Sequence, residues 1–146
     1  MKKSLITTKL GAGVLIAVLL CGCQMVSSDE KLVNTTMTNW KAALIAQDLD
    51  KFMDSYSEDY ESDRGFDKED IRGFMERGID EGFLDNIEVD IKGAEIAIEG
   101  DKAQVAPVVW TGRRGEMTIE FTLQKEGDTW RIVNSKRERR RSEDSD

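Results

Sequence analysis

The sequence predicts an α+β domain in which N-terminal helices pack on a curved four-stranded antiparallel sheet. Up to Gly82, apolar residues recur at spacings of three and four, which is the period of a helix face. After Gly82 they alternate with polar residues, which is the period of a strand. Short turns containing glycine separate the strand-like runs and indicate an antiparallel meander. Helices that cover one face of such a sheet make an α+β domain.

Three helices are predicted before the sheet. The first spans about residues 30–47. Asp48 and Asp67 are expected to begin the second and third, because an aspartate side chain accepts hydrogen bonds from the first backbone N–H groups of a helix. Gly82 is expected to end the third helix. The apolar faces consist of Leu32, Val33, Met37, Trp40 and Leu44, then Leu49, Phe52, Met53 and Tyr56, then Ile71, Phe74, Met75 and Ile79.

The sheet is predicted to begin with one long strand that bends at Gly93. Its apolar residues lie at odd positions before Gly93 and at even positions after it, and a glycine at such a slip indicates a β-bulge. Three further strands are predicted over residues 103–111, 117–124 and 130–133. Pro107 cannot donate a ladder hydrogen bond, so it is expected at an edge, a bulge or a bend.

Residues 1–22 predict a lipoprotein signal peptide. Lysines precede an apolar run over residues 10–20, which has signal-peptide length. A membrane-spanning helix needs roughly 20 apolar residues, and a retained N-terminal anchor helix is the alternative. The stretch Leu20-Cys21-Gly22-Cys23 resembles the bacterial lipobox, whose last cysteine is alkylated by a lipid. The resemblance implies cleavage before Cys23 and attachment to the membrane of a bacterial cell envelope through Cys23.

The organisation predicted after the signal peptide has three parts. Residues 23–29 form a tether, residues 30–136 the domain, and residues 137–146 a charged tail. The tail lacks apolar residues and is expected to be disordered, although its basic cluster could instead touch anionic lipid. In a host with two membranes, Gln24 lacks the aspartate that resembles an inner-membrane retention signal. The periplasmic face of the outer membrane is therefore favoured.

Composition excludes several kinds of chemistry. The sequence has no histidine, which excludes Ser-His-Asp catalysis and HExxH zinc sites. Its two cysteines are Cys21 and Cys23, so the processed domain would have neither a free thiol nor a disulfide. The acidic residues from Glu58 to Asp67 do not have the spacing of a calcium-binding loop. We expect no metal and no cofactor. The net charge of −8 argues against nucleic acid as a partner.

Several stretches, in this order, resemble the nuclear transport factor 2-like superfamily, a cystatin-like α+β cone. They are residues 39–43, 47–53, 56–60, 96–105 and 123–133. The resemblance spans roughly residues 30–136. Enzymes of the superfamily use an Asp or His, often with a Tyr, in the pocket of the cone. Carried over, it makes Asp59, Tyr56 and Tyr60 the catalytic candidates, with the aspartate as base and a tyrosine as hydrogen-bond donor. The competing interpretation places Tyr56 in the core and Asp59 in a solvated acidic loop.

Trp40, Trp110 and Phe121 are the candidates to line a cavity that holds a small apolar ligand, with core packing as the alternative for each. The sequence thus favours a lipid-anchored, non-enzymatic envelope domain that binds a small ligand or a protein partner. The alternative is an isomerase- or dehydratase-type enzyme acting on a small hydrophobic substrate in the cone. A homodimer through the outer face of the sheet, common in this fold, is a further expectation.

Overall fold

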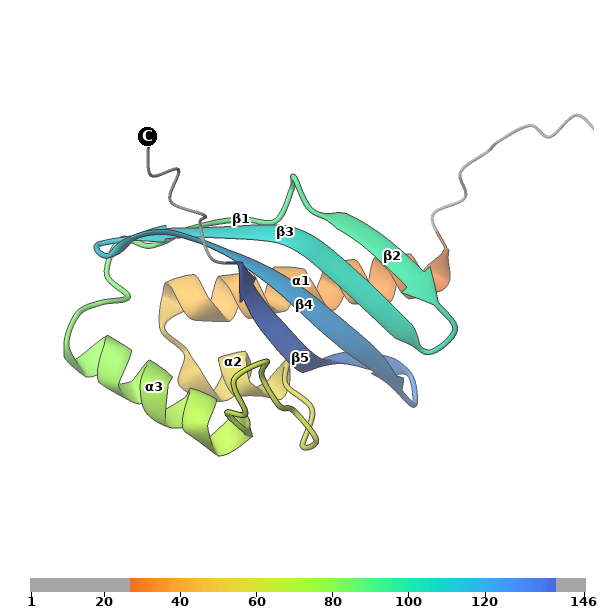
Figure 1. Ribbon diagram of the computed structural model, residues 1–146, viewed down its shortest axis with the longest axis horizontal. Helices are drawn as coiled ribbons and strands as arrows, with labels where there is room; N and C mark the ends of the chain where they lie inside the picture. Colours follow the sequence, from red (N-terminus) through yellow and green to blue (C-terminus); the bar gives the residue numbers. More distant parts are fainter. Residues whose placement is uncertain (1–26, 139–146) are drawn as a thin grey trace, which may run out of the picture.

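The computed structural model describes residues 27–138, and the predicted signal peptide, Cys23 and residues 139–146 lie outside this range. Three helices lie on one side of a single curved antiparallel sheet (Figure 1). They are α1 (Ser28–Ala46), α2 (Leu49–Asp54) and α3 (Lys68–Asp80). Within residues 27–138, no helix is both long and apolar enough to cross a membrane.

The helices begin at polar caps. The side chain of Asp48 accepts a hydrogen bond from the Lys51 N–H at the start of α2. Asp67 and Asp70 form a reciprocal capping box at the start of α3. Both predicted helix starts are confirmed. Helix α1 begins two residues before the predicted start, because the Ser27 hydroxyl accepts a hydrogen bond from the Glu30 N–H at 3.1 Å.

The sheet has five strands where the sequence predicts four. They are β1 (Glu88–Asp90), β2 (Glu95–Glu99), β3 (Lys102–Gly112), β4 (Gly115–Glu126) and β5 (Thr129–Glu138). The order is β1-β3-β4-β5, and β2 also pairs with β3. Between β1 and β2, Asp90 Oδ1 accepts hydrogen bonds from the N–H groups of Lys92 and Gly93. This local turn replaces the ladder, so the predicted bend becomes a break between two strands.

Two irregularities in the ladders add to the curvature of the sheet. The register of β3 with β4 shifts between Val105 and Val108, around Pro107, as the sequence predicts. The register of β4 with β5 shifts between Thr122 and Leu123. Figure 1 shows the resulting concave face turned toward α1.

Strand β5 extends beyond the predicted end of the domain. Arg137 lies opposite Ile119 and Glu138 lies opposite Thr118 on β4, whereas the sequence analysis places residues 137 and 138 in the charged tail. Pairing with β4 satisfies backbone groups regardless of side-chain polarity, so the strand continues without apolar residues.

The core fills the space between the helices and the concave face of the sheet. The ring of Trp40 lies 5.8 Å from that of Phe52 and 5.0 Å from that of Phe121, measured between centroids. Trp130 is 1 % exposed. Of the residues predicted on the apolar helix faces, Leu32 and Phe74 are exposed. Phe74 belongs to α3, which stands away from the sheet in Figure 1.

Candidate functional site

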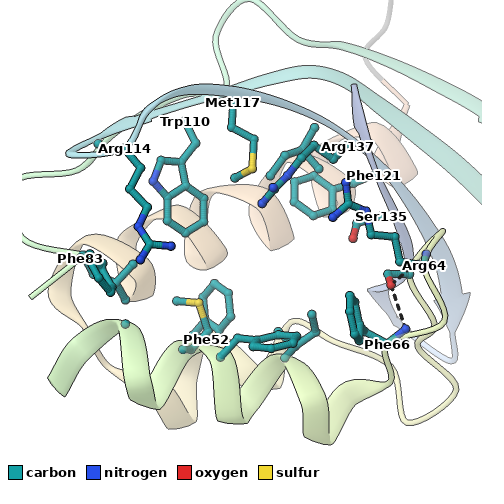
Figure 2. Close-up of a pocket in the computed structure, with 18 of the residues that line it drawn as sticks. Phe52, Arg64, Phe66, Phe83, Trp110, Arg114, Met117, Phe121, Ser135 and Arg137 are labelled. Atoms are coloured by element: carbon teal, nitrogen blue, oxygen red, sulfur yellow. Dashed lines mark hydrogen bonds between the residues drawn. The ribbon is translucent and has the colours of Figure 1, made fainter. Parts of the chain in front are cut away.

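A cavity of about 1080 Å³ lies between α3 and the sheet. Figure 2 shows α3 below it and the sheet above it. Its volume is at the upper end of the roughly 300–1,000 Å³ that small-molecule sites occupy. The apolar part of the wall comes from three regions of the chain. It includes Ile71 and Met75 of α3, Leu84 of the following loop, and Trp110, Met117 and Phe121 of the sheet.

All three predicted pocket residues lie in the cavity wall. Trp40 and Phe121 are each 1 % exposed and are also core residues. Trp110 is only partly buried. It lies directly opposite Met117 on the neighbouring strand, and residues opposite each other share a face of the sheet. Trp110 and Met117 therefore form a continuous apolar part of the wall.

Tyr56 and Tyr60 also line the cavity, and their hydroxyls are already hydrogen-bonded. The Trp40 indole N–H donates to the Tyr56 hydroxyl oxygen at 3.2 Å, and the hydroxyls of Tyr60 and Ser135 lie 2.5 Å apart. Burial raises the pKa of both tyrosines above the ordinary value. Both therefore remain neutral at physiological pH.

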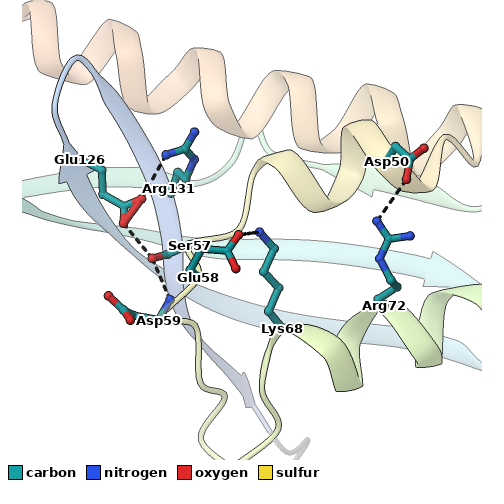
Figure 3. Close-up of polar contacts among 8 residues, drawn as sticks. All are labelled: Asp50, Ser57, Glu58, Asp59, Lys68, Arg72, Glu126 and Arg131. Atoms are coloured by element: carbon teal, nitrogen blue, oxygen red, sulfur yellow. Dashed lines mark hydrogen bonds and ion pairs between the residues drawn. The ribbon is translucent and has the colours of Figure 1, made fainter.

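Asp59 is not brought together with the two tyrosines. Its side chain is exposed and does not line the cavity. Its backbone N–H donates to the Ser57 hydroxyl, which in turn donates to Glu126 Oε2 at 2.8 Å (Figure 3). Asp59 lies in a turn on the outside of the domain. The three catalytic candidates therefore do not form one acid–base group.

Aromatic side chains that are exposed to solvent also line the cavity. Phe66 and Phe74 are 36 % and 42 % exposed, and their rings meet edge to face at 5.0 Å. The guanidinium carbon of Arg114 lies 3.8 Å from the centre of the Phe83 ring. Phe66 and Phe83 are not among the predicted pocket residues. The available signal for Phe66 was its position, since it is a large apolar residue in an otherwise polar loop, whereas Phe83 stands beside Leu84 and has no such signal.

Arginines form the polar part of the wall. They are Arg64, Arg77, Arg113, Arg114 and Arg137. Figure 2 shows Arg64 and Arg137 extending into the cavity from the side of β5, and Arg114 extending into it from the opposite side. None of them is a predicted site residue, because their segments are interpreted from the sequence as a polar loop, a helix, a turn and a tail. Four acidic residues also line the cavity: Asp63, Glu81, Glu116 and Glu138.

Within residues 27–138, no group of three or more Asp, Glu, His or Cys side chains is placed to hold a metal ion. The cavity wall instead combines a large aromatic surface with guanidinium groups and neutral hydroxyls. Such a wall is suited to enclosing an apolar molecule and donating hydrogen bonds to its polar end.

No model of a known protein family matches the sequence, and no curated protein is significantly similar to it. Solved structures are similar in fold. Bd1075 of Bdellovibrio bacteriovorus has a TM-score of 0.63 at 17 % identity, covering 74 % of this chain and 39 % of its own. The chain thus spans well under half the length of Bd1075.

Two further structures match over most of their length. A protein of unknown function with a cystatin-like fold from Nostoc punctiforme has a TM-score of 0.63 at 16 % identity, covering 80 % of this chain and 95 % of its own. A candidate scytalone dehydratase from Novosphingobium aromaticivorans has a TM-score of 0.63 at 15 % identity, covering 75 % and 82 %. The chain therefore has the cystatin-like fold of nuclear transport factor 2-like proteins, as its sequence predicts. At these identities the likeness concerns the fold alone.

Proposed function

We propose that this protein is a lipid-anchored domain of a bacterial cell envelope that binds a small, largely apolar ligand without converting it. The observation that carries the proposal is the cavity between α3 and the sheet, which combines an apolar wall with lining residues that are exposed to solvent. Exposed aromatic residues of this wall, Phe66 and Phe74, support the same interpretation, because apolar surface is favourable where a ligand covers it.

The anchor is supported by the signal-like residues 1–22 and by the lipobox resemblance that ends at Cys23. Helix α1 begins at Ser28, so only residues 24–27 separate it from the proposed lipid attachment site. Four extended residues span about 14 Å. The domain would therefore be held close to the membrane surface, at the periplasmic face of the outer membrane if the host has two membranes.

The alternative function is that of a dehydratase- or isomerase-type enzyme acting on a small hydrophobic substrate. Its support is the fold shared with the candidate scytalone dehydratase, together with Tyr60 in the cavity wall. An enzyme of this kind needs a base beside the substrate. The exposed position of Asp59 weighs against the residue that the sequence offers for this role.

A second copy of the chain, bound through the outer face of the sheet, is a further proposed partner. Light scattering of the purified protein tests it, and a monomer across the measured concentrations would remove it.

Fluorescence titration with N-phenyl-1-naphthylamine, an uncharged aromatic dye, tests the binding function. We expect saturable binding that weakens about tenfold in Trp110→Ala, because about 1.4 kcal/mol of aromatic contact is lost. Ile45→Ala is the matched control, since Ile45 is 49 % exposed on α1 and does not line the cavity. Equal affinities for the parent and both variants would place the dye elsewhere and remove the support for the cavity.

A further inference from the structure

We infer that the ligand is an amphipathic anion, with an apolar body in the cavity and an oxyanion head group held by Arg64 and Arg137. This inference rests on the proposed binding function and names the chemical class of its ligand. The two kinds of basic residue are distributed differently in the domain. Residues 27–138 contain seven arginines and eight lysines. Five of these arginines line the cavity, and none of the lysines does.

The choice of arginine points to a specific kind of partner. A guanidinium presents its N–H donors as a planar fork that matches a carboxylate or phosphate, whereas a lysine ammonium is a compact and strongly hydrated charge. Arginine also packs on aromatic rings, as Arg114 does on Phe83 and Arg77 does on Phe74. A wall of arginine and aromatic residues therefore suits a molecule that is both apolar and anionic.

The five arginines that line the cavity differ in ion pairing from the other two described arginines, Arg72 and Arg131. Arg72 pairs with Asp50 at 3.1 Å, and Arg131 pairs with Glu126 at 3.3 Å (Figure 3). In the described part of the chain, the five cavity arginines form no ion pair with a carboxylate. This holds although the protein is acidic and four acidic residues line the same cavity. The guanidinium groups that extend into the cavity thus remain available to an anion.

A backbone hydrogen bond brings Arg64 and Arg137 to the same part of the wall. The Asp63 N–H donates to the Ser135 carbonyl oxygen at 3.1 Å, which joins the loop before α3 to β5. Arg64 follows Asp63 in the chain, and Arg137 lies on the same face of β5 as Ser135 because side chains alternate along a strand. Figure 2 shows both arginine side chains extending toward the region beside Phe121. Two like charges at one place favour an anion between them.

The rest of the cavity sets the size and character of the body. From the Arg64 and Arg137 end, the wall continues through Met117 and Trp110 toward Phe83 and Arg114 (Figure 2). The volume of about 1080 Å³ accommodates a fused ring system or a folded alkyl chain. The head group is a negatively charged oxyanion. Either a carboxylate or a phosphate ester would provide it.

Two dyes that differ in one charged group test this inference. 1-Anilinonaphthalene-8-sulfonate and N-phenyl-1-naphthylamine share their rings, and only the former carries a sulfonate. In the full chain, we expect the sulfonate to bind at least about tenfold more tightly than the neutral dye. The double variant R64Q/R137Q should remove that preference while changing the neutral dye's affinity by less than about twofold. All variants contain the same residues 1–26, so dye bound there contributes equally to each and does not affect the comparison between variants.

The matched control is R72Q/R131Q, which removes the same two charges from the ion-paired arginines outside the cavity. It should leave the preference for the sulfonate unchanged, and circular dichroism and thermal melting establish that each variant is folded. If the control weakens sulfonate binding as much as R64Q/R137Q does, bulk charge explains the preference and the inference is overturned. Equal binding of the two dyes overturns it as well, while the proposed binding function stands. Failure of both dyes to bind removes the proposed function itself.

Competition identifies the head group. Dodecanoate, dodecyl phosphate and uncharged dodecanol are each titrated against the bound sulfonate dye. Stronger displacement by dodecanoate assigns a carboxylate, and stronger displacement by dodecyl phosphate assigns a phosphate ester. Displacement by dodecanol at the same concentration as the two anions would overturn the inference, because the head-group charge would then contribute nothing.

Discussion

The Trp40 indole N–H donates a hydrogen bond to the Tyr56 hydroxyl oxygen at 3.2 Å, with both side chains buried. This bond joins the middle of α1 to the segment that follows α2. It also engages the hydroxyl of a residue that the family resemblance proposes as a catalytic donor. Tyr56 therefore has a structural role, which a conservative substitution can measure.

Tyr56→Phe should destabilise the fold by about 1–3 kcal/mol, because it leaves the buried Trp40 N–H without its acceptor. Urea unfolding measures the change in the free energy of unfolding. Binding of N-phenyl-1-naphthylamine to the folded variant should stay within about twofold of the parent, since the aromatic ring remains. A loss below about 0.5 kcal/mol would show that Trp40 finds another acceptor.

Alkaline titration should distinguish the folded from the unfolded protein by the pKa of the tyrosines. Burial raises the pKa of Tyr56 and Tyr60 above the ordinary value of 10.0, and these are the only two tyrosines in the sequence. A group with a raised pKa in the folded state contributes stability that is present below its unfolded pKa and is lost as pH rises toward the folded value. The free energy of unfolding should therefore fall above about pH 10.

The ultraviolet absorbance of tyrosinate follows this titration directly. The native protein should ionise at higher pH than the same protein in concentrated urea, and Tyr56 should ionise only as the fold is lost. Coincident native and unfolded curves would contradict the burial of both hydroxyls.

Trp130→Ala should destabilise the protein by roughly 3–5 kcal/mol, the range for removing a buried tryptophan. Trp130 is 1 % exposed and lies at the start of β5, near α1. The Thr36 hydroxyl donates to the Trp130 carbonyl oxygen at 2.7 Å, and this bond to the backbone survives the substitution. The loss should thus report side-chain packing together with the hydrogen bond that the Trp130 indole N–H donates to Asp29 Oδ1 at 3.4 Å. Chemical denaturation measures it, with the exposed Ile45→Ala as control, and a loss below about 1 kcal/mol would contradict the burial of Trp130.

Local signals account for what the sequence predicts well. Asp48 and Asp67 mark helix starts because capping involves only neighbouring residues. Pro107 marks an irregularity because the missing N–H is a property of the residue itself. Trp40 and Phe121 follow from periodicity, which reports the face of an element and hence its side toward the interior.

The arginine part of the site depends on tertiary structure. Arg64 belongs to a loop, Arg114 to the turn between β3 and β4, and Arg137 to the end of β5. The bond between Asp63 and Ser135 brings Arg64 and Arg137 to one part of the cavity wall, and the period of apolar residues carries no information about such a contact. The break between β1 and β2 was missed for a related reason. The Asp90 side chain there accepts hydrogen bonds from backbone N–H groups that the alternating pattern assigns to a strand.

The proposed lipid on Cys23 should be detectable by metabolic labelling. With labelled palmitate supplied to cells, the parent chain and Cys21→Ser should incorporate label, and Cys23→Ser should not. Cys21→Ser is the matched control because it removes the neighbouring thiol while keeping Gly22 and Cys23.

Cell fractionation distinguishes a lipid from a retained helix. One acyl chain binds a membrane only marginally, and additional chains make the attachment stable at about 0.8 kcal/mol per buried CH₂. If residues 1–22 are removed and Cys23 carries several chains, the mature protein should remain with membranes in high salt and be released by detergent. Its N-terminal peptide should then begin at the modified Cys23. A membrane-bound protein that retains residues 1–22 and carries no label would replace the lipid anchor with an N-terminal helix.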